Sequence, residues 1–228
     1  MAALLCLQLG VDLEEDLTDC ISTMKAIVLD ASASEAIRSL CAQTLGTCVY
    51  LSCEQFSTRY DTLQTLKEAW ASMKPAATLT SLFSSALSAW VLLLERCDSG
   101  LISQIINEVQ PKICSFLESP FVEVRISAGE ALAVLFEIAV DDIDEDFRFS
   151  NHNHLKDILE QLALDSAKYH AKRTRRCKKF LLDKSMMSSL TTKCPIHKSN
   201  LTNERFCKLK AVIPSCSMIY SVYYLRVI

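Results

Sequence analysis

The sequence is poor in the residues that interrupt helices. Its 228 residues include only 4 glycines and 5 prolines. A fold built on many β-turns needs both residue types at its turns. Leucine, alanine and serine are abundant instead, so the composition predicts a helical protein. The length is enough for one sizeable domain, or for one domain with an extension.

Long apolar runs are also missing. The longest, "ALSAWVLLLE" from Ala86, is too short to span a bilayer. The opening "MAALLCLQLG" lacks a basic region and leads directly into the acidic run from Asp12 to Asp16, which argues against a secretory signal. We therefore expect no membrane partner.

The eleven cysteines do not form a pattern that predicts disulfides. Cys41, Cys48 and Cys114 fall at apolar positions of expected helices, where a free thiol packs as a small hydrophobic side chain. This pattern favours a reduced compartment inside the cell. The expected location is cytoplasmic, nuclear or both.

The motifs of common enzymes are absent from the sequence. It has no glycine-rich phosphate loop and no nucleophile elbow. Cys194, His197, Cys207 and Cys216 offer four soft ligands, but their spacing does not match common zinc modules. We expect no catalytic residue, no metal site, no cofactor and no small-molecule substrate. A metal-stabilised enzyme or module built on the tail cysteines stays as an alternative hypothesis.

Charge is divided unevenly along the chain. Residues 1–150 carry 22 acidic and 9 basic side chains, whereas residues 151–228 carry 5 acidic and 15 basic ones. This division predicts an acidic body followed by a basic, anion-seeking extension.

Apolar residues recur every three or four positions and predict six helices within residues 1–140. Ser32 and Glu35 are expected to form a capping box at the second helix. Ser119 is expected to be the N-cap of the sixth, with Pro120 as its first residue. The stripes expected to pack in the core include Leu17, Ile21, Met24 and Val28 in the first helix, Ile37, Leu40, Cys41, Thr44, Leu45 and Cys48 in the second, and Phe56, Tyr60, Leu63, Leu66 and Trp70 in the third.

The six helices form three hairpins whose first helices are expected to begin near residues 11, 56 and 101. The segment "EAIRSLCAQTLG" (35–46) aligns with "VEVRISAGEALA" (122–133), 87 residues later, with Arg38 over Arg125. These arginines are expected to cap or bridge neighbouring repeats. A period of 40–47 residues is typical of HEAT and armadillo arrays. The predicted fold is therefore an all-α, armadillo/HEAT-like α-solenoid with a concave surface, although an ordinary helical bundle would show the same stripes. The helix-like opening "AALLCLQL" would fit a first hairpin that lacks an upstream cap.

An acidic linker is predicted over residues 141–150, because five of the six residues from Asp141 to Asp146 are acidic. Residues 151–180 are predicted to form a helix that ends in a basic arm. A helix that is basic on all sides cannot pack in a core, and phosphate backbones attract such charge. A solvated helix end, a nuclear-localisation patch and an acidic protein surface stay open as alternatives. The candidate binding residues are Lys168, Lys172, Arg173, Arg175, Arg176, Lys178 and Lys179.

The segment "LEQLALDSAKYHAKRTRR" (159–176) resembles a motif of the interferon-related developmental regulator family, "L..LA.DS.K.RAK.DRR", which closes a helical-repeat domain. His170 and Thr174 differ from that motif. The resemblance covers roughly residues 1–177 and includes "SPFVEVRISAGEALAVLFEIA" and the acidic loop. The matching positions are Leu162, Ala163, Asp165, Ser166, Lys168, Ala171, Lys172, Arg175 and Arg176.

The resemblance implies an armadillo-like fold and a regulator that is not an enzyme. Members of the family are described as transcriptional co-regulators and as ribosome-associated repressors of translation, in which a helix beyond the repeats enters an RNA-lined channel. After Arg176 this chain departs from the family. Residues 181–228 show no amphipathic period and are expected to be a poorly ordered tail, which we interpret as an alternative terminus.

Two functions therefore lead. In the first, the repeats bind protein partners and the basic arm meets the RNA of a ribosome, in control of translation or gene expression. In the alternative, the chain is a nuclear co-regulator scaffold that binds only proteins, and the arm is a localisation signal.

Overall fold

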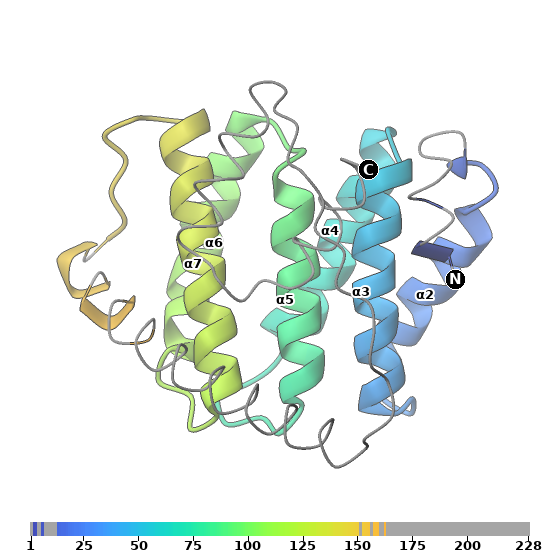
Figure 1. The fold of residues 1–228 in the computed structure, drawn as a ribbon, viewed down its shortest axis with the longest axis horizontal. Helices are drawn as coiled ribbons and strands as arrows, with labels where there is room; N and C mark the ends of the chain where they lie inside the picture. The colour runs from blue at the N-terminus through green and yellow to red at the C-terminus, as the bar shows by residue number, and fades with distance from the viewer. Residues whose placement is uncertain are drawn as a thin grey trace, which may run out of the picture. The chain divides into compact units, whose positions relative to one another are not determined.

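The computed structural model describes residues 2–3, 6, 13–150, 152–155, 157–159 and 162. Within residues 13–150 it contains six long helices and no β-strand (Figure 1). All six belong to a compact unit that includes residues 1–150. The basic arm and the tail from residue 181 lie outside the described residues. The helices are α2 (Thr18–Leu29), α3 (Glu35–Ser52), α4 (Phe56–Ala71), α5 (Thr80–Leu94), α6 (Ser99–Phe116) and α7 (Val122–Asp142).

The helices pair into three antiparallel hairpins, α2 with α3, α4 with α5, and α6 with α7. The second helices form one layer, in which α3 packs on α5 and α5 packs on α7. Figure 1 shows these three side by side, with α4 and α6 behind them. This arrangement confirms the expected all-α solenoid of three hairpins.

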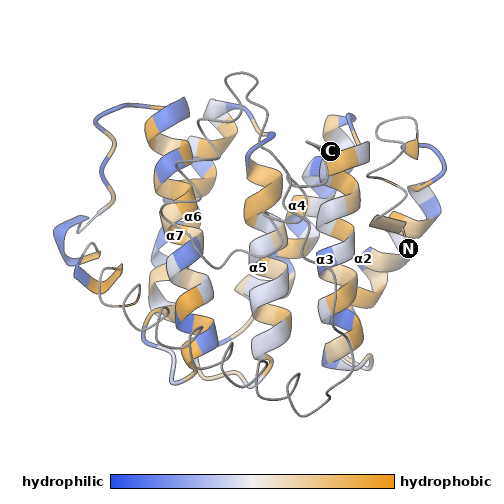
Figure 2. Cartoon of the chain, in the orientation of Figure 1, coloured by the Kyte–Doolittle hydropathy of each residue, from blue (hydrophilic) through white to orange (hydrophobic). Residues whose placement is uncertain are grey.

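The core follows the predicted stripes at most positions. Trp70 of α4 and Trp90 of α5 are buried, and their rings meet edge to face at 5.3 Å. Phe83 of α5 and Phe116 of α6 meet at 4.4 Å. Each fully buried large apolar side chain contributes about 1.5–3 kcal/mol to folding. Buried apolar residues occur on all six helices, and Figure 2 shows hydrophobic positions along each of them.

Two residues of α3 that were expected in the core are exposed. Ile37 is 53% exposed and Leu40 is 64% exposed. Periodicity correctly placed α3 but did not reveal which side of it meets the next repeat. That side carries Ser39 and Gln43, which bond to α5. Ile37 and Leu40 therefore fall on a side that no described helix covers.

The expected helix starts were wrong in detail. Ser34, not Ser32, is the N-cap of α3, and its hydroxyl accepts from the Ile37 N–H. Ser32 instead donates its N–H and its hydroxyl to Asp30. The capping box fails because Ser34 is the N-cap, which makes Glu35 the first residue of α3 and not the third. Glu35 has a partner in another repeat, as described below.

The first and sixth helices also begin later than expected. Helix α2 starts at Thr18 rather than near residue 11. Helix α7 starts at Val122 with Phe121 as its N-cap, so Ser119 is not the cap. The Ser119 hydroxyl donates to the Pro75 carbonyl at 2.6 Å and accepts from the Phe121 N–H at 3.2 Å. It therefore ties two loops together.

The acidic segment after α7 is anchored by aromatic side chains. Asp141 and Asp142 still belong to α7. Beyond them, Phe147 and Phe149 pack on Phe136 of α7, with ring centroids 6.2 and 5.8 Å from it. Phe149 is buried. The expected linker thus begins as the last residues of α7, and its later part packs on that helix through Phe147 and Phe149.

Candidate functional site

Hydrogen bonds between equivalent helices follow the repeat period. The Ser39 and Ser85 hydroxyls lie 2.6 Å apart, and the Gln43 amide donates to Ser85 at 2.9 Å. Between α5 and α7, Ser127 donates to Ser84 at 2.8 Å. These bonds join α3, α5 and α7 into one continuous polar-lined layer.

Small side chains let two of these helices approach closely. A Cβ atom added to Gly46 of α3 would lie 2.6 Å from the Cβ of Ala89 and 3.1 Å from its Cα. Carbon atoms normally stay 3.5–4.0 Å apart. Only glycine at position 46 permits the present spacing between α3 and α5.

Carboxylates from one repeat hold the helix starts of the next. Glu35 of α3 accepts from the backbone N–H groups of Ser81, at 2.8 Å, and Leu82, at the start of α5. Glu14 accepts from the N–H groups of Glu54 and Gln55, just before α4. Helix starts leave N–H groups without intrahelical partners, and the helix dipole favours negative charge there. Two acidic residues thus have structural roles that connect repeats.

Arg38 and Arg125 occupy equivalent positions in α3 and α7, and both donate to backbone carbonyls. Arg38 donates to the Val28 carbonyl at 2.9 Å, and Arg125 donates to the Ser119 carbonyl at 2.8 Å. Each arginine thus caps a carbonyl of the backbone segment that precedes its own helix within the same hairpin. The expectation of a cap was confirmed, and that of a bridge between repeats was wrong for these bonds.

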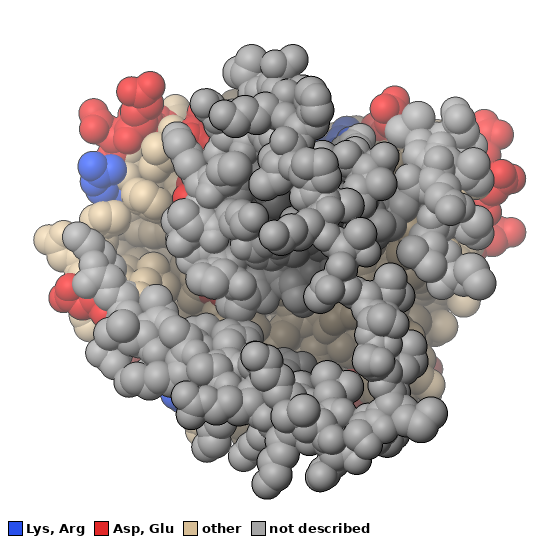
Figure 3. Space-filling model, viewed as in Figure 1, with Lys and Arg blue, Asp and Glu red and all other residues tan. Residues whose placement is uncertain are grey.

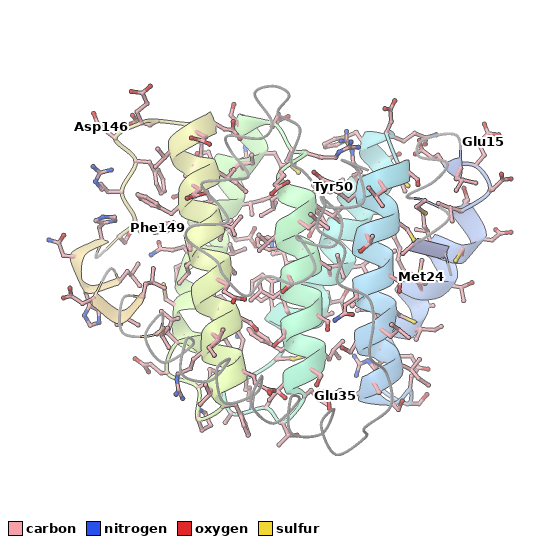
Figure 4. All side chains as sticks on the ribbon, in the orientation of Figure 1. Glu15, Met24, Glu35, Tyr50, Asp146 and Phe149 are labelled. Carbon is pink, nitrogen blue, oxygen red and sulfur yellow. The ribbon has the colours of Figure 1, made fainter. Side chains whose placement is uncertain are left out.

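The α3–α4 turn and the end of α5 form a corner rich in aromatic and cationic groups. The Arg96 guanidinium lies 5.0 Å above the Tyr50 ring, and the Tyr50 hydroxyl donates to Glu95 at 3.2 Å. Arg59 of α4 donates to the Arg96 carbonyl. Figure 4 labels Tyr50 and Glu35 at opposite ends of α3.

An exposed aromatic pair lies at the start of α4. The rings of Phe56 and Tyr60 stack at 5.7 Å, with exposed fractions of 56% and 37%. The sequence stripe placed both in the core, and that was wrong, because the interior side of α4 begins with Leu63 and Leu66. Exposed stacked aromatic side chains are typical of protein-binding surfaces.

Acidic side chains dominate the third hairpin and the turn after it. Figure 3 shows Asp and Glu side chains at the edges of this view, and Figure 4 labels Asp146 beyond α7. Lys67 of α4 pairs with Glu108 of α6 at 2.6 Å. The acidic residues of α7 and of the turn after it are Glu123, Glu130, Glu137, Asp141, Asp142, Asp144, Glu145 and Asp146. A partner with positive charge fits this end of the array.

Burial raises the pKa of five of the described thiols above the ordinary value. Burial raises the pKa of Cys53 and of Cys97 to about 11, and it also raises the pKa of Cys41, Cys48 and Cys114. A raised pKa removes the thiolate that nucleophilic catalysis and metal binding need. Within the residues that the structure describes, no three His, Cys, Asp or Glu side chains are grouped to hold a metal ion.

None of the described helices is long and apolar enough to cross a membrane. The candidate binding residues Lys168, Lys172, Arg173, Arg175, Arg176, Lys178 and Lys179 all lie outside the described residues. The described surface instead offers the layer of second helices, the exposed aromatic pair and the acidic end.

The three stacked hairpins, joined by bonds that recur every 40 to 47 residues, define an armadillo/HEAT-like α-solenoid. The sequence profile of the interferon-related developmental regulator family matches residues 1–181. The chain therefore belongs to this family.

Individual relatives agree with the family match. Interferon-related developmental regulator 1 of Sus scrofa is 34% identical over 187 residues, which cover 77% of this chain and 41% of the relative. Interferon-related developmental regulator 2 of Mus musculus is 37% identical over 185 residues, covering 76% of this chain and 42% of the relative. The chain thus spans about two fifths of the length of the curated relatives it matches. The family match includes the basic arm and ends two residues beyond it.

Proposed function

We propose that this chain is a non-enzymatic regulatory scaffold that acts in the control of translation or gene expression. Its repeats bind protein partners, and its basic arm, residues 168–179, meets RNA in a ribosome. One observation carries the proposal: an acidic helical array is followed by an arm with seven lysines and arginines in twelve positions.

The helical array and the basic arm differ in the partners that their charges attract. The array has an acidic end, so it does not attract phosphate, whereas the arm carries the cations that counterion release rewards. The family match extends through the arm, and the names of the matched relatives describe developmental regulators. These points support separate roles for the two parts, in which the array binds proteins and the arm binds RNA.

Co-sedimentation with ribosomes across a salt series tests the proposal. We expect binding that weakens as salt rises and is lost in a variant with Lys172, Arg173, Arg175 and Arg176 changed to alanine. Removing four phosphate contacts should reduce the slope of log affinity against log salt by about 3. The matched control also removes four charges, by changing Lys184, Lys193, Lys198 and Lys208 to alanine. Equal loss in both variants, or no binding at low salt, would refute the role of the arm.

A second candidate function rests on the same lysines and arginines. A short cluster of this kind also serves as a nuclear-localisation signal, in a co-regulator scaffold that binds only proteins. Residues 165–180 fused to a fluorescent protein would enter the nucleus under this alternative, and ribosome binding by the full chain would be absent.

A further inference from the structure

Two side chains of α3 reach forward to the next helix of the layer. The Gln43 amide donates to Ser85 of α5 at 2.9 Å, and the Tyr50 hydroxyl donates to Glu95 at 3.2 Å. These bonds join residues that are 42 and 45 positions apart in the sequence. Gln43 and Tyr50 are two helical turns apart, so they lie on the same side of α3. We call their two places in a second helix the forward positions.

In α7 both forward positions are glutamates. The alignment of α3 with α7 puts Glu130 over Gln43 and Glu137 over Tyr50, and both glutamates are partly exposed. Helix α7 packs on α5, and no helix within residues 13–150 follows it in the layer. A helix that follows α7 would meet these two carboxylates, so it should carry a cation at each matching position.

The repeat spacing continues on the far side of α7. Between first helices, Lys67 of α4 pairs with Glu108 of α6, which is 41 residues later. Gln110 of α6 in turn donates to the Ser150 carbonyl, which is 40 residues later. The chain therefore passes α6 after one more repeat length, as it would in a fourth hairpin.

The next second helix is expected in the basic part of the sequence. Second helices begin at residues 35, 80 and 122, so a fourth should begin near residue 165. Asp165 and Ser166 stand there, and both residue types favour an N-cap. Residues 152–155 and 157–159 are helical, as the first helix of a fourth hairpin requires.

The basic residues fall at the spacing that the forward positions need. Ser85 lies 42 residues after its partner Gln43. Counting 42 residues from Glu130 gives Lys172, and counting 42 from Glu137 gives Lys179.

We propose that the basic arm, residues 168–179, belongs to a fourth second helix that packs along α7 through the pairs Glu130–Lys172 and Glu137–Lys179. In place of the single helix expected over residues 151–180, the chain turns near residue 165. A basic helix of another protein would suit the same carboxylates. The arm is favoured over it because a short connection to α7 gives the arm a high effective concentration.

The two pairs restrain the arm when RNA is absent. Ion pairs at a protein surface are individually weak and are screened by salt. A phosphate backbone neutralises many cations at once, so it displaces the arm from α7. This consequence rests on the proposed function, whereas the pairing with α7 does not.

Zero-length cross-linking of the full chain, followed by peptide mass spectrometry, tests the position of the arm. A water-soluble carbodiimide joins a carboxylate to a lysine amine in contact with it, without a spacer. We expect cross-links from Glu130 to Lys172 and from Glu137 to Lys179 in the monomer. Lys67 and Glu108, whose charged atoms are 2.6 Å apart, supply the internal control for a folded array.

Two variants make the cross-links specific. Glu130→Gln should remove the first cross-link and leave the second. Lys172→Arg keeps the positive charge but lacks the reactive amine, so it should do the same. In both variants the control cross-link should form as in the unchanged chain.

Three cross-linking results would overturn the proposal. The first is no cross-link from either glutamate while the control cross-link forms. The second is an equal yield from the arm lysines to the acidic turn, residues 144–146, because charge without repeat spacing would then hold the arm. The third is cross-links confined to a dimer, because a second copy would then supply the arm.

Ribosome co-sedimentation tests the restraint separately. Changing Glu130 and Glu137 together to glutamine should raise the affinity for ribosomes severalfold at low salt. The control variant, Asp144→Asn with Asp146→Asn, removes the same charge and should raise it less. An equal gain in both variants would refute the restraint. If no variant binds ribosomes, the proposed function fails, whereas the cross-links still decide where the arm lies.

Discussion

Replacing Gly46 by alanine tests the closest contact in the array. Glycine is normally a poor helix residue, and a Gly→Ala change at an open position stabilises a helix by about 1 kcal/mol. At Gly46 the new Cβ would lie 2.6 Å from the Cβ of Ala89. Carbon atoms need 3.5–4.0 Å, so α3 and α5 must separate by roughly 1 Å.

The separation should outweigh the gain in helix propensity. It loosens the Ser39–Ser85 and Gln43–Ser85 hydrogen bonds and the packing of buried side chains around them. Overpacking of this kind costs about 1–3 kcal/mol. We expect a net loss on the order of 1–2 kcal/mol in the free energy of unfolding. The melting temperature should then fall by roughly 2–8 °C.

Thermal and urea unfolding, followed by circular dichroism and by tryptophan fluorescence, measure this loss. Trp70 and Trp90 lie together in the middle hairpin and report on it directly. Gly100→Ala is the matched control, because its nearest atom, Oδ1 of Asp98, lies at an ordinary 3.7 Å. That change should be neutral or stabilising.

A second substitution makes the test specific. Ala89→Gly removes the atom that the new Cβ would meet, so it should restore part of the stability lost in Gly46→Ala. The two changes should therefore couple favourably by about 1 kcal/mol in a double-mutant cycle. If Gly46→Ala stabilises the chain as much as helix propensity alone predicts, the close approach of α3 and α5 is refuted.

Three further predictions concern stability. Glu35→Gln should lower the free energy of unfolding by about 1 kcal/mol, because the N–H groups at the start of α5 lose a charged acceptor. Urea unfolding should show no such loss for the control Glu68→Gln, which changes an exposed residue. Ser85→Ala should cost about 1–2 kcal/mol in the same assay, since Gln43 loses its acceptor and Ser39 keeps only its bond to the Ser81 carbonyl, and an unchanged midpoint would contradict the bonds described. Burial raises the pKa of Cys53 and Cys97 to about 11, so the folded state favours the protonated thiols. The contribution of these thiols to the free energy of unfolding is complete below pH 9 and is lost as pH rises through 11. The double change Cys53→Ala with Cys97→Ala should therefore flatten the fall in melting temperature at alkaline pH.

The sequence was sufficient to predict most of the residues that are buried within a hairpin. Ile21, Met24 and Val28 of α2, and Leu63 and Leu66 of α4, are buried as their spacing predicted. Spacing succeeds here because an apolar stripe at helical period must face the interior of its own hairpin. The alignment of Arg38 with Arg125 succeeded in part, since both side chains donate to a backbone carbonyl that precedes their own helix, although Val28 lies ten residues and Ser119 six residues before the arginine.

Partners in a neighbouring repeat could not be predicted in the same way. Glu35 was assigned a local role in a capping box, whereas Glu14 and Glu35 each bind N–H groups 40 to 47 residues away. Likewise, the stripe that includes Ile37 and Leu40 contains no information on which side the next hairpin occupies. Those facts depend on the stacking geometry. The prediction for residues 168–179 stays a prediction, because they lie outside the described residues.

The carboxylate caps give the array a direction. Glu14 and Glu35 belong to the first hairpin, and both hold helix starts of the second. Losing the first hairpin would therefore uncap α4 and α5 together, while losing the third would leave these N-terminal caps in place. In a linear array, where each unit is stabilised by its neighbours, unfolding that begins at the first hairpin should propagate more readily than unfolding that begins at the third. A partner that grips the first hairpin would thus control the stability of helices that it never touches.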